Sequence, residues 1–299
     1  MKTGRALVLF TLVLLLGCER QVADSRASCV KDALAQPELS NGVAVFTALD
    51  GTVADARSGW LNDRNGNSVL DMASLTKPLV AAEVRRRVEA GSLDLEKPIQ
   101  ELLPDAVFVP ETAAITVQQL LQHRAGFDRS AGDPLFMASP PSCYLAAQDV
   151  LRRRPEKPAG QQVIYSNAGY CVLGRILLND PSGMDADLLH ALQSPLGAAG
   201  GWRGSLRQLH SAMSAALPLA ELPSDPSLPD GSHYAFGWRS WPANGGGPQW
   251  THFGRLPGML SVAVSDGTGW VLVAHFTGDP DDVDGSSEQA AKSLWRCMK

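Results

Sequence analysis

Two strand-like regions, one near each end of the 299-residue chain, constrain the fold most. In each, two apolar segments rich in β-branched and aromatic residues flank an Asp-Gly dipeptide, a pattern typical of a β-hairpin. The hairpins are expected within residues 43–54 and 260–276. Residues 74 to about 216 have a mostly helical pattern, interrupted by Pro- and Gly-rich breaks. This order predicts an α/β (α+β) protein in which both chain ends build one antiparallel sheet and a mostly helical lobe is inserted between them.

The inserted region opens with Ser74-Leu75-Thr76-Lys77, followed by Pro78. Proline is tolerated only in the first turn of a helix, so a helix is expected to begin near Ser74. Residues three apart share one helix face, which places the hydroxyl of Ser74 beside the amine of Lys77. A lysine that has lost its charge accepts the serine proton, so the pair predicts a nucleophile and its base. The alternative is a capping serine with a solvated lysine.

Two further motifs follow in the chain. Tyr165-Ser166-Asn167 precedes a helical pattern, and His252-Phe253-Gly254-Arg255 precedes the second hairpin. A Ser-x-x-Lys element, a Tyr-x-Asn element and a basic-x-Gly strand together form the signature of penicillin-interacting serine enzymes. The chain therefore resembles the β-lactamase-related serine hydrolases, which include class C β-lactamases, low-molecular-weight D,D-peptidases and family VIII esterases. The resemblance covers roughly residues 40–278 and includes segments 120–127 and 234–238.

The resemblance implies a β-lactamase/penicillin-binding-protein-like transpeptidase fold for residues 29–299. Its α/β lobe would comprise residues 29–73 and 232–299, with terminal helices flanking the sheet, and its helical lobe residues 74–231. The active site would lie in the cleft between the lobes.

Residue roles follow from the same resemblance. Ser74 would be the nucleophile, Lys77 its proton acceptor and Tyr165 the partner acid/base, and the sequence leaves open which of the last two takes the first proton. The oxyanion hole would use the backbone N–H groups of Ser74 and Arg255. His123 is expected to be structural. The residues expected to bind substrate are Asn167, His252, Gly254 and Arg255. We expect neither a metal nor another cofactor.

The chain departs from its relatives at two places. Relatives commonly carry Thr or Ser at the position of Phe253, and β-lactamases of this type carry Lys at that of His252. Segment 195–197 also runs almost directly into segment 200–209, where relatives insert several tens of residues. We therefore expect a reduced pocket wall.

These features predict a serine hydrolase that forms an acyl-enzyme on an ester or amide, with esterase-like activity favoured. D,D-peptidase and β-lactamase activities are the alternatives within the family. The alternative of another class is an envelope binding protein with a degenerate site. The complete set Ser74, Lys77, Tyr165 and Asn167 argues against degeneration, whereas Phe253 and the short segment argue for it.

The N-terminus has the pattern of an export signal. Lys2 and Arg5 precede an apolar run too short to span a membrane, and Leu15-Leu16-Gly17-Cys18 resembles a bacterial lipobox. We expect a lipoprotein signal peptide at residues 1–17, lipidation of Cys18 and a polar tether at residues 18–28. The protein would then be anchored in the bacterial cell envelope, facing the periplasm. The alternative is an ordinary secretory signal that is cut elsewhere.

The formal net charge is −5, and cleavage after residue 17 would remove the basic residues Lys2 and Arg5 and change it to −7 (−5 − 2). This acidic balance argues against a nucleic-acid partner. The expected partners are a small-molecule or peptide substrate and the membrane, and we expect a monomer.

Disulfides persist in exported proteins, and four cysteines follow Cys18. Because the terminal helices of the resembled family pack side by side, the resemblance implies a Cys29–Cys297 bridge. Cys143 and Cys171 either pair or leave Cys171 as a buried thiol.

The lipobox leads to a direct test. Replacement Cys18→Ala should abolish labelling by radioactive palmitate and release the protein from the detergent-extracted fraction, because the acceptor thiol is gone. Unchanged palmitate labelling of the variant would contradict this assignment.

Overall fold

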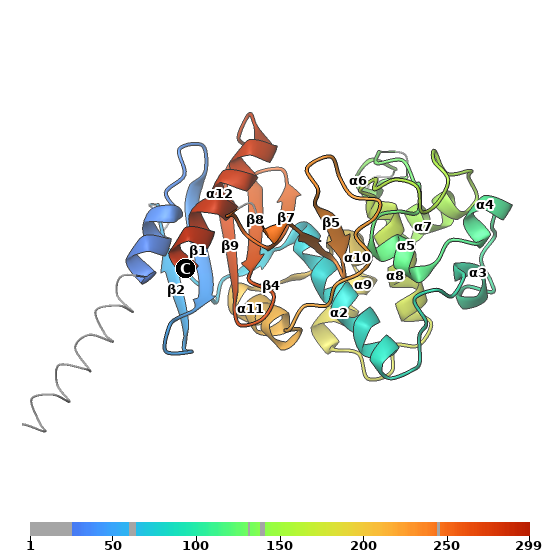
Figure 1. The fold of residues 1–299 in the computed structure, drawn as a ribbon, viewed down its shortest axis with the longest axis horizontal. Helices are drawn as coiled ribbons and strands as arrows, with labels where there is room; N and C mark the ends of the chain where they lie inside the picture. Colours follow the sequence, from blue (N-terminus) through green and yellow to red (C-terminus); the bar gives the residue numbers. More distant parts are fainter. Residues whose placement is uncertain (1–25, 60–63, 131, 138–140, 244–245) are drawn as a thin grey trace, which may run out of the picture.

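The computed structural model describes residues 26–59, 64–130, 132–137, 141–243 and 246–299. The expected signal peptide, Cys18 and the tether up to residue 25 lie outside these described residues. Figure 1 shows two lobes side by side, one built on a sheet and the other on short helices.

The described residues form a seven-stranded sheet in the order β2-β1-β9-β8-β7-β6-β5. All its neighbouring strands are antiparallel, and β1 from one chain end pairs with β9 from the other, as predicted. The two expected hairpins are present as β1–β2 and β8–β9. The strands are β1 Ser40–Thr47, β2 Val53–Arg57, β5 His233–Ala235, β6 Trp238–Ser240, β7 Trp250–Leu256, β8 Met259–Ser265 and β9 Val271–Thr277.

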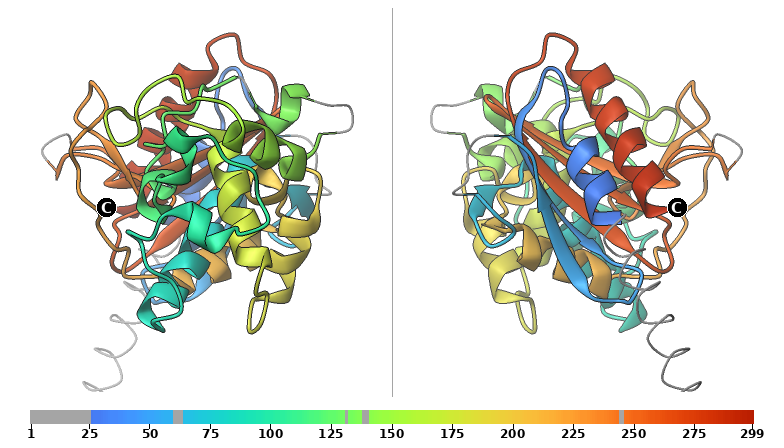
Figure 2. Two further views of the ribbon diagram at one scale, coloured as in Figure 1. Left: turned by 90° about the vertical axis from the view of Figure 1, so that its right-hand side faces the viewer. Right: turned by 90° about the vertical axis from the view of Figure 1, so that its left-hand side faces the viewer.

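Helices from the two chain ends cover one face of this sheet. A helix through residues 26–33 lies beside α12 (Val283–Met298), as the right-hand view of Figure 2 shows. Val30 packs with Leu294 in a shared apolar core, and the Cys29–Cys297 disulfide joins the two helices with a Cα–Cα distance of 5.5 Å. The first of these helices includes residues 26–28, at the end of the expected tether.

The other face of the sheet carries α11 (Leu206–Ala215). Leu206, Leu209 and Met213 recur on one side of this helix and are buried. The imidazole Nε2 of His210 lies 3.1 Å from the carbonyl oxygen of Val271 in β9. Thus α11 packs on the sheet, although it falls within the span 74–231 that we assigned to the helical lobe.

The remaining elements form the helical lobe and a two-stranded sheet that joins it to the rest. Among them α8 is buried nearly all round, which identifies it as the central helix of its lobe. None of the helices within the described ranges is both long and apolar enough to cross a membrane. These elements are β3 Val69–Asp71, η1 Ala73–Leu75, α2 Thr76–Glu89, α3 Ile99–Leu102, α4 Pro110–Ala113, α5 Val117–Leu121, α6 Pro134–Met137, α7 Cys143–Leu151, α8 Asn167–Leu178, α9 Ala186–Gln193, α10 Gly197–Gly200 and β4 Arg203–Ser205.

Two glycines allow the sheet to approach the start of α2. Gly237, between β5 and β6, has a φ of +79°, and a Cβ atom there would lie 2.6 Å from the carbonyl oxygen of Lys77. A Cβ atom on Gly254 in β7 would lie 3.2 Å from the backbone nitrogen of Ser74. The β5–β6 turn and strand β7 therefore meet α2 and η1 at the expected nucleophile.

The Cys29–Cys297 bridge should contribute to stability without affecting the cleft. Cys297 lies about 20 Å along α12 from Asp284, which faces the cleft. The double replacement Cys29→Ala/Cys297→Ala should lower the free energy of unfolding by about 2–5 kcal/mol, because the unfolded chain regains the freedom of a long loop. Urea unfolding measures this change. A loss of less than about 1 kcal/mol would contradict the expectation.

Candidate active site

Ser74 lies in the tight turn η1, immediately before α2. Ala73 has a φ of +47°, which is unfavourable for a residue with a side chain, and the hydroxyl of Thr76 donates a 2.7 Å hydrogen bond to its carbonyl oxygen. The Thr76 oxygen in turn accepts from the backbone N–H of Trp202 at 2.9 Å. The surrounding chain thus fixes the strained turn that presents Ser74. The regular helix begins two residues after Ser74, close to the predicted position.

Lys77 is fully buried, and its Nζ has three oxygen partners. It donates to Ser74 Oγ at 2.9 Å, to Asn167 Oδ1 at 2.7 Å and to the carbonyl oxygen of Ala199 at 2.6 Å. Burial lowers the pKa of Lys77 to about 7, against the opposing effect of the Asp133 carboxylate. A lysine with this pKa is partly neutral near pH 7, as the proton acceptor of a serine must be.

Tyr165 approaches the same oxygen from the residue just before the N-cap of α8. Its hydroxyl donates to Ser74 Oγ at 2.9 Å, and Ser166 caps α8 by accepting from the N–H of Gly169. Burial raises the pKa of Tyr165, which keeps its phenol protonated at neutral pH. The structure therefore brings Ser74, Lys77, Tyr165 and Asn167 into one hydrogen-bonded group.

His123 supports Tyr165 from behind. Its ring centroid lies 4.3 Å from that of Tyr165, and its Nδ1 accepts from the backbone N–H of Ser166 at 3.1 Å. Burial and the charge of Lys77 hold the pKa of His123 well below its ordinary value. These contacts give His123 a structural place beneath the site.

The remaining wall of the site comes from β7. His252 is buried, with Nδ1 3.0 Å from the carbonyl oxygen of Phe253, and burial together with the charge of Lys77 lowers its pKa to about 3. Arg255 turns toward α12, where it pairs with Asp284 at 2.7 Å and donates to Ser287 at 2.9 Å. Gly254 allows the backbone of β7 to approach the nucleophile turn closely, since Met72 and Ser74 leave no room for a side chain there. The β7 wall thus carries a neutral imidazole and an arginine that is already paired.

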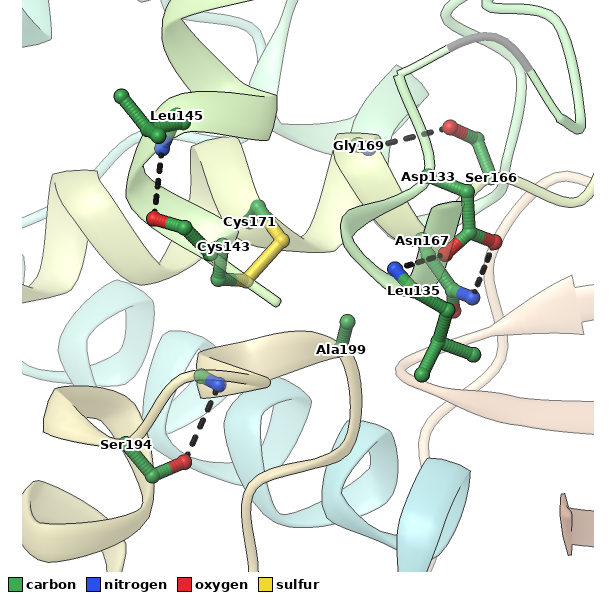
Figure 3. The surroundings of a disulfide bond; sticks show 12 residues. Asp133, Leu135, Cys143, Leu145, Ser166, Asn167, Gly169, Cys171, Ser194 and Ala199 are labelled. Carbon is green, nitrogen blue, oxygen red and sulfur yellow. Dashed lines mark hydrogen bonds between the residues drawn. A yellow bond between two sulfur atoms is a disulfide. The ribbon is translucent and has the colours of Figure 1, made fainter. Parts of the chain in front are cut away.

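Two groups in the site were not predicted from the sequence. Asp133 is buried and accepts from Asn167 Nδ2 at 2.7 Å, as Figure 3 shows. The carbonyl oxygen of Ala199 belongs to the backbone, so its residue type carries no signal. Asp133 stands in no recognisable motif, and only its Asp-Pro dipeptide, which favours a turn, distinguishes it.

The short connection that contains α10 lies against the nucleophile turn. Gly200 packs against Ala73, where a Cβ atom would lie 3.4 Å from the Ala73 carbonyl carbon. Only a narrow cavity of about 30 Å³ remains between Ser74 and this segment. The α10 segment thus packs directly on the turn that carries Ser74, and the reduced pocket wall stays a prediction.

A cleft of about 580 Å³ opens in front of Ser74 between the two lobes. This volume suits a small organic substrate. The lining residues include Ser74, Arg129, Tyr165, Asn167, Tyr234, Arg239, His252, Phe253, Arg255, Asp284 and Glu288.

Comparison with known proteins identifies the family of the chain. The family model described as Beta-lactamase matches residues 31–187, and the chain belongs to this family of β-lactamase-related serine hydrolases. Dichelobacter nodosus has a protein named as the fimbrial assembly protein FimD of serogroup D, which is 35% identical over 148 residues, 46% of this chain and 37% of that protein. Penicillin-binding protein 4 of Amycolatopsis lactamdurans is 31% identical over 181 residues, 56% of this chain and 45% of that protein. The chain thus spans less than half the length of these relatives.

Among solved structures, the fold is similar to that of D-amino acid amidase from Ochrobactrum anthropi SV3. The TM-score is 0.70 at 18% identity, and the similarity covers 93% of this chain and 97% of the amidase. The fold is also similar to that of the octameric penicillin-binding protein homologue from Pyrococcus abyssi, with a TM-score of 0.64 at 14% identity over 94% of this chain and 76% of that chain. These similarities confirm the predicted β-lactamase/penicillin-binding-protein-like fold.

The lowered pKa of Lys77 gives a pH prediction. A neutral amine accepts the Ser74 proton, so the rate of covalent labelling by a fluorophosphonate should rise with pH around a midpoint near 7 and then level off. Mass spectrometry of the intact protein follows the labelling. Lys77→Ala should slow it by several orders of magnitude, and Ser74→Ala should abolish it. A midpoint near lysine's ordinary value of about 10.4 would contradict the role given to burial.

Proposed function

We propose that this protein is a serine hydrolase that transfers the acyl group of a small ester to Ser74 and then to water. The observation that carries the proposal is the pair of 2.9 Å hydrogen bonds that Ser74 Oγ accepts from Lys77 and Tyr165. A hydroxyl between a base and a proton donor is arranged for nucleophilic attack and for departure of the leaving group. The half-buried position of Ser74 at the cleft leaves it within reach of a substrate.

The two partners divide the proton transfers according to their pKa values. Neutral Lys77 accepts the Ser74 proton as Oγ bonds to the carbonyl carbon. Tyr165 holds its proton at neutral pH and is placed to donate it to the leaving oxygen. In net terms a proton therefore passes from Ser74 through Lys77 and Tyr165 to the departing alcohol. In the second step a water molecule attacks the acyl group, and the proton transfers run in the reverse direction to restore Ser74. The backbone N–H groups of Ser74 and Arg255 would stabilise the oxyanion, at roughly 3 kcal/mol each.

The β7 wall favours an ester over a β-lactam. A β-lactam carries a carboxylate, and Phe253 offers it no hydroxyl. His252 is neutral because its pKa is about 3, and the guanidinium of Arg255 is paired with Asp284. A missing charge-assisted hydrogen bond costs roughly 1.5–3 kcal/mol, or about ten- to a hundredfold in affinity.

One observation favours a second candidate. Arg129 lines the same cleft, is exposed and has no acidic partner among the described residues. It is the cation in the cleft best able to receive the terminal carboxylate of a D-alanyl peptide, so D,D-peptidase activity is the alternative. Faster hydrolysis of an acyl-D-alanyl-D-alanine peptide than of any ester would favour that alternative.

We place the protein in the cell envelope, tethered at Cys18 and facing the periplasm. The lipobox-like sequence supports this proposal. The two disulfides in the described part of the chain support it as well, because such bonds persist in oxidising compartments.

The substrate preference can be measured on a soluble form that starts after Cys18. We expect kcat/KM for p-nitrophenyl butyrate to exceed that for nitrocefin by about tenfold or more, since β7 itself offers the β-lactam carboxylate neither a hydroxyl at position 253 nor an unpaired cation. Ser74→Ala supplies the blank for both substrates. If nitrocefin is hydrolysed about tenfold more efficiently than the ester, the proposed esterase activity is wrong and β-lactamase activity should replace it.

A further inference from the structure

The Cys143–Cys171 disulfide lies close to the catalytic group, unlike the bridge at the chain ends. It joins α7 to α8 with a Cα–Cα distance of 5.1 Å, and both cysteines are buried. Figure 3 shows the bridge with Asn167 to its right and Ala199, on the α10 segment, below it.

Two chain segments that supply partners of Lys77 meet at this bridge, and a third is hydrogen-bonded to the first of them. The first is α8, in which Asn167 and Cys171 are four residues apart and share one helix face. Asn167 Oδ1 accepts from Lys77 Nζ at 2.7 Å. A displacement of Cys171 would therefore also move the amide that holds the lysine.

The second segment is the turn that enters α10. The backbone N–H of Cys143 donates to the carbonyl oxygen of Pro195 at 2.8 Å. Gly197 packs so tightly on the bridge that a Cβ atom there would lie 2.8 Å from Cys143 Sγ. Two residues later the carbonyl oxygen of Ala199 accepts from Lys77 Nζ at 2.6 Å.

The third segment carries Asp133, which is linked to the bridge through Asn167 of the first segment. Its carboxylate accepts from Asn167 Nδ2 at 2.7 Å and from the backbone N–H of Leu135 at 2.9 Å. Asp133 thereby orients the amide of Asn167 so that the amide oxygen faces Lys77.

We propose that the Cys143–Cys171 disulfide is a positioning element for Lys77, which holds the segments bearing Asn167, Ala199 and Asp133 in register around its amine. The inference rests on the proposed function, because it concerns the base of that reaction. The bridge touches no substrate and acts only through these segments.

Removal of the bridge should let the three segments separate slightly and admit water to the amine. Burial is the largest cause of the lowered pKa of Lys77, so hydration should move this pKa upward. The titratable groups that face the amine are Asp133, Tyr165, Tyr170, His123 and His252.

The test is the pH profile of fluorophosphonate labelling in Cys143→Ala/Cys171→Ala. We expect the midpoint to move up by about half a pH unit or more, which slows labelling about threefold on the acidic side. The matched control is Cys29→Ala/Cys297→Ala, which also loses one disulfide and should keep the wild-type midpoint. A merely structural bridge would lower the melting temperature and leave the midpoint unchanged.

Gly197→Ala provides a second variant with both disulfides intact, in case the first one folds poorly. The added methyl group should push α10 away from Cys143 and shift the midpoint in the same direction. Wild-type midpoints in both variants would overturn the proposal.

Nitrogen-15 NMR of protein with isotope-labelled lysine follows the Nζ of Lys77 directly. Absence of fluorophosphonate labelling in the wild-type protein would count against the proposed function. An unshifted Nζ titration in the Cys143→Ala/Cys171→Ala variant would count against the positioning role alone.

Discussion

The buried amine of Lys77 is the group on which the rest of the site depends. An amine without water around it is costly unless hydrogen-bond acceptors surround it, and here Ser74, Asn167 and Ala199 supply three oxygens. The same burial that creates this demand lowers the pKa of Lys77 to about 7. One physical cause thus dictates the surrounding architecture and makes the lysine suitable as a base.

The fold meets this demand with segments distant in sequence. The start of α2 supplies Ser74 and Lys77, the start of α8 supplies Asn167, and the backbone of α10 supplies the third acceptor. The sheet closes the group from the side, where Gly254 permits β7 to pack on the nucleophile turn. Strained backbone conformations also occur in and around the site. They are found at Ala73, His123 and Phe236, which all have positive φ.

Sequence reasoning predicted the parts of this arrangement that depend on local spacing. The three-residue separation of Ser74 and Lys77 and the placement of Tyr165 and Asn167 on either side of Ser166 predicted which side chains meet. The hairpin patterns predicted that both chain ends share one sheet. The partner of Arg255 was not predictable, because Asp284 follows it only after two intervening strands and pairs with it through the tertiary fold. The packing of α10 on Ala73 was not predictable for a similar reason, because the sequence shows the length of the connection before β4 but not its tertiary contacts.

If Ser74 carries the acyl group during turnover, that group can be trapped on its side chain. Acid quenching of the soluble protein during hydrolysis of p-nitrophenyl butyrate, followed by mass spectrometry of its peptides, would locate the butyryl group. We expect an ester on the peptide that contains Ser74, and none in Ser74→Ala. Hydrolysis at an undiminished rate in Ser74→Ala, or a butyryl group on another residue of the working enzyme, would contradict this expectation.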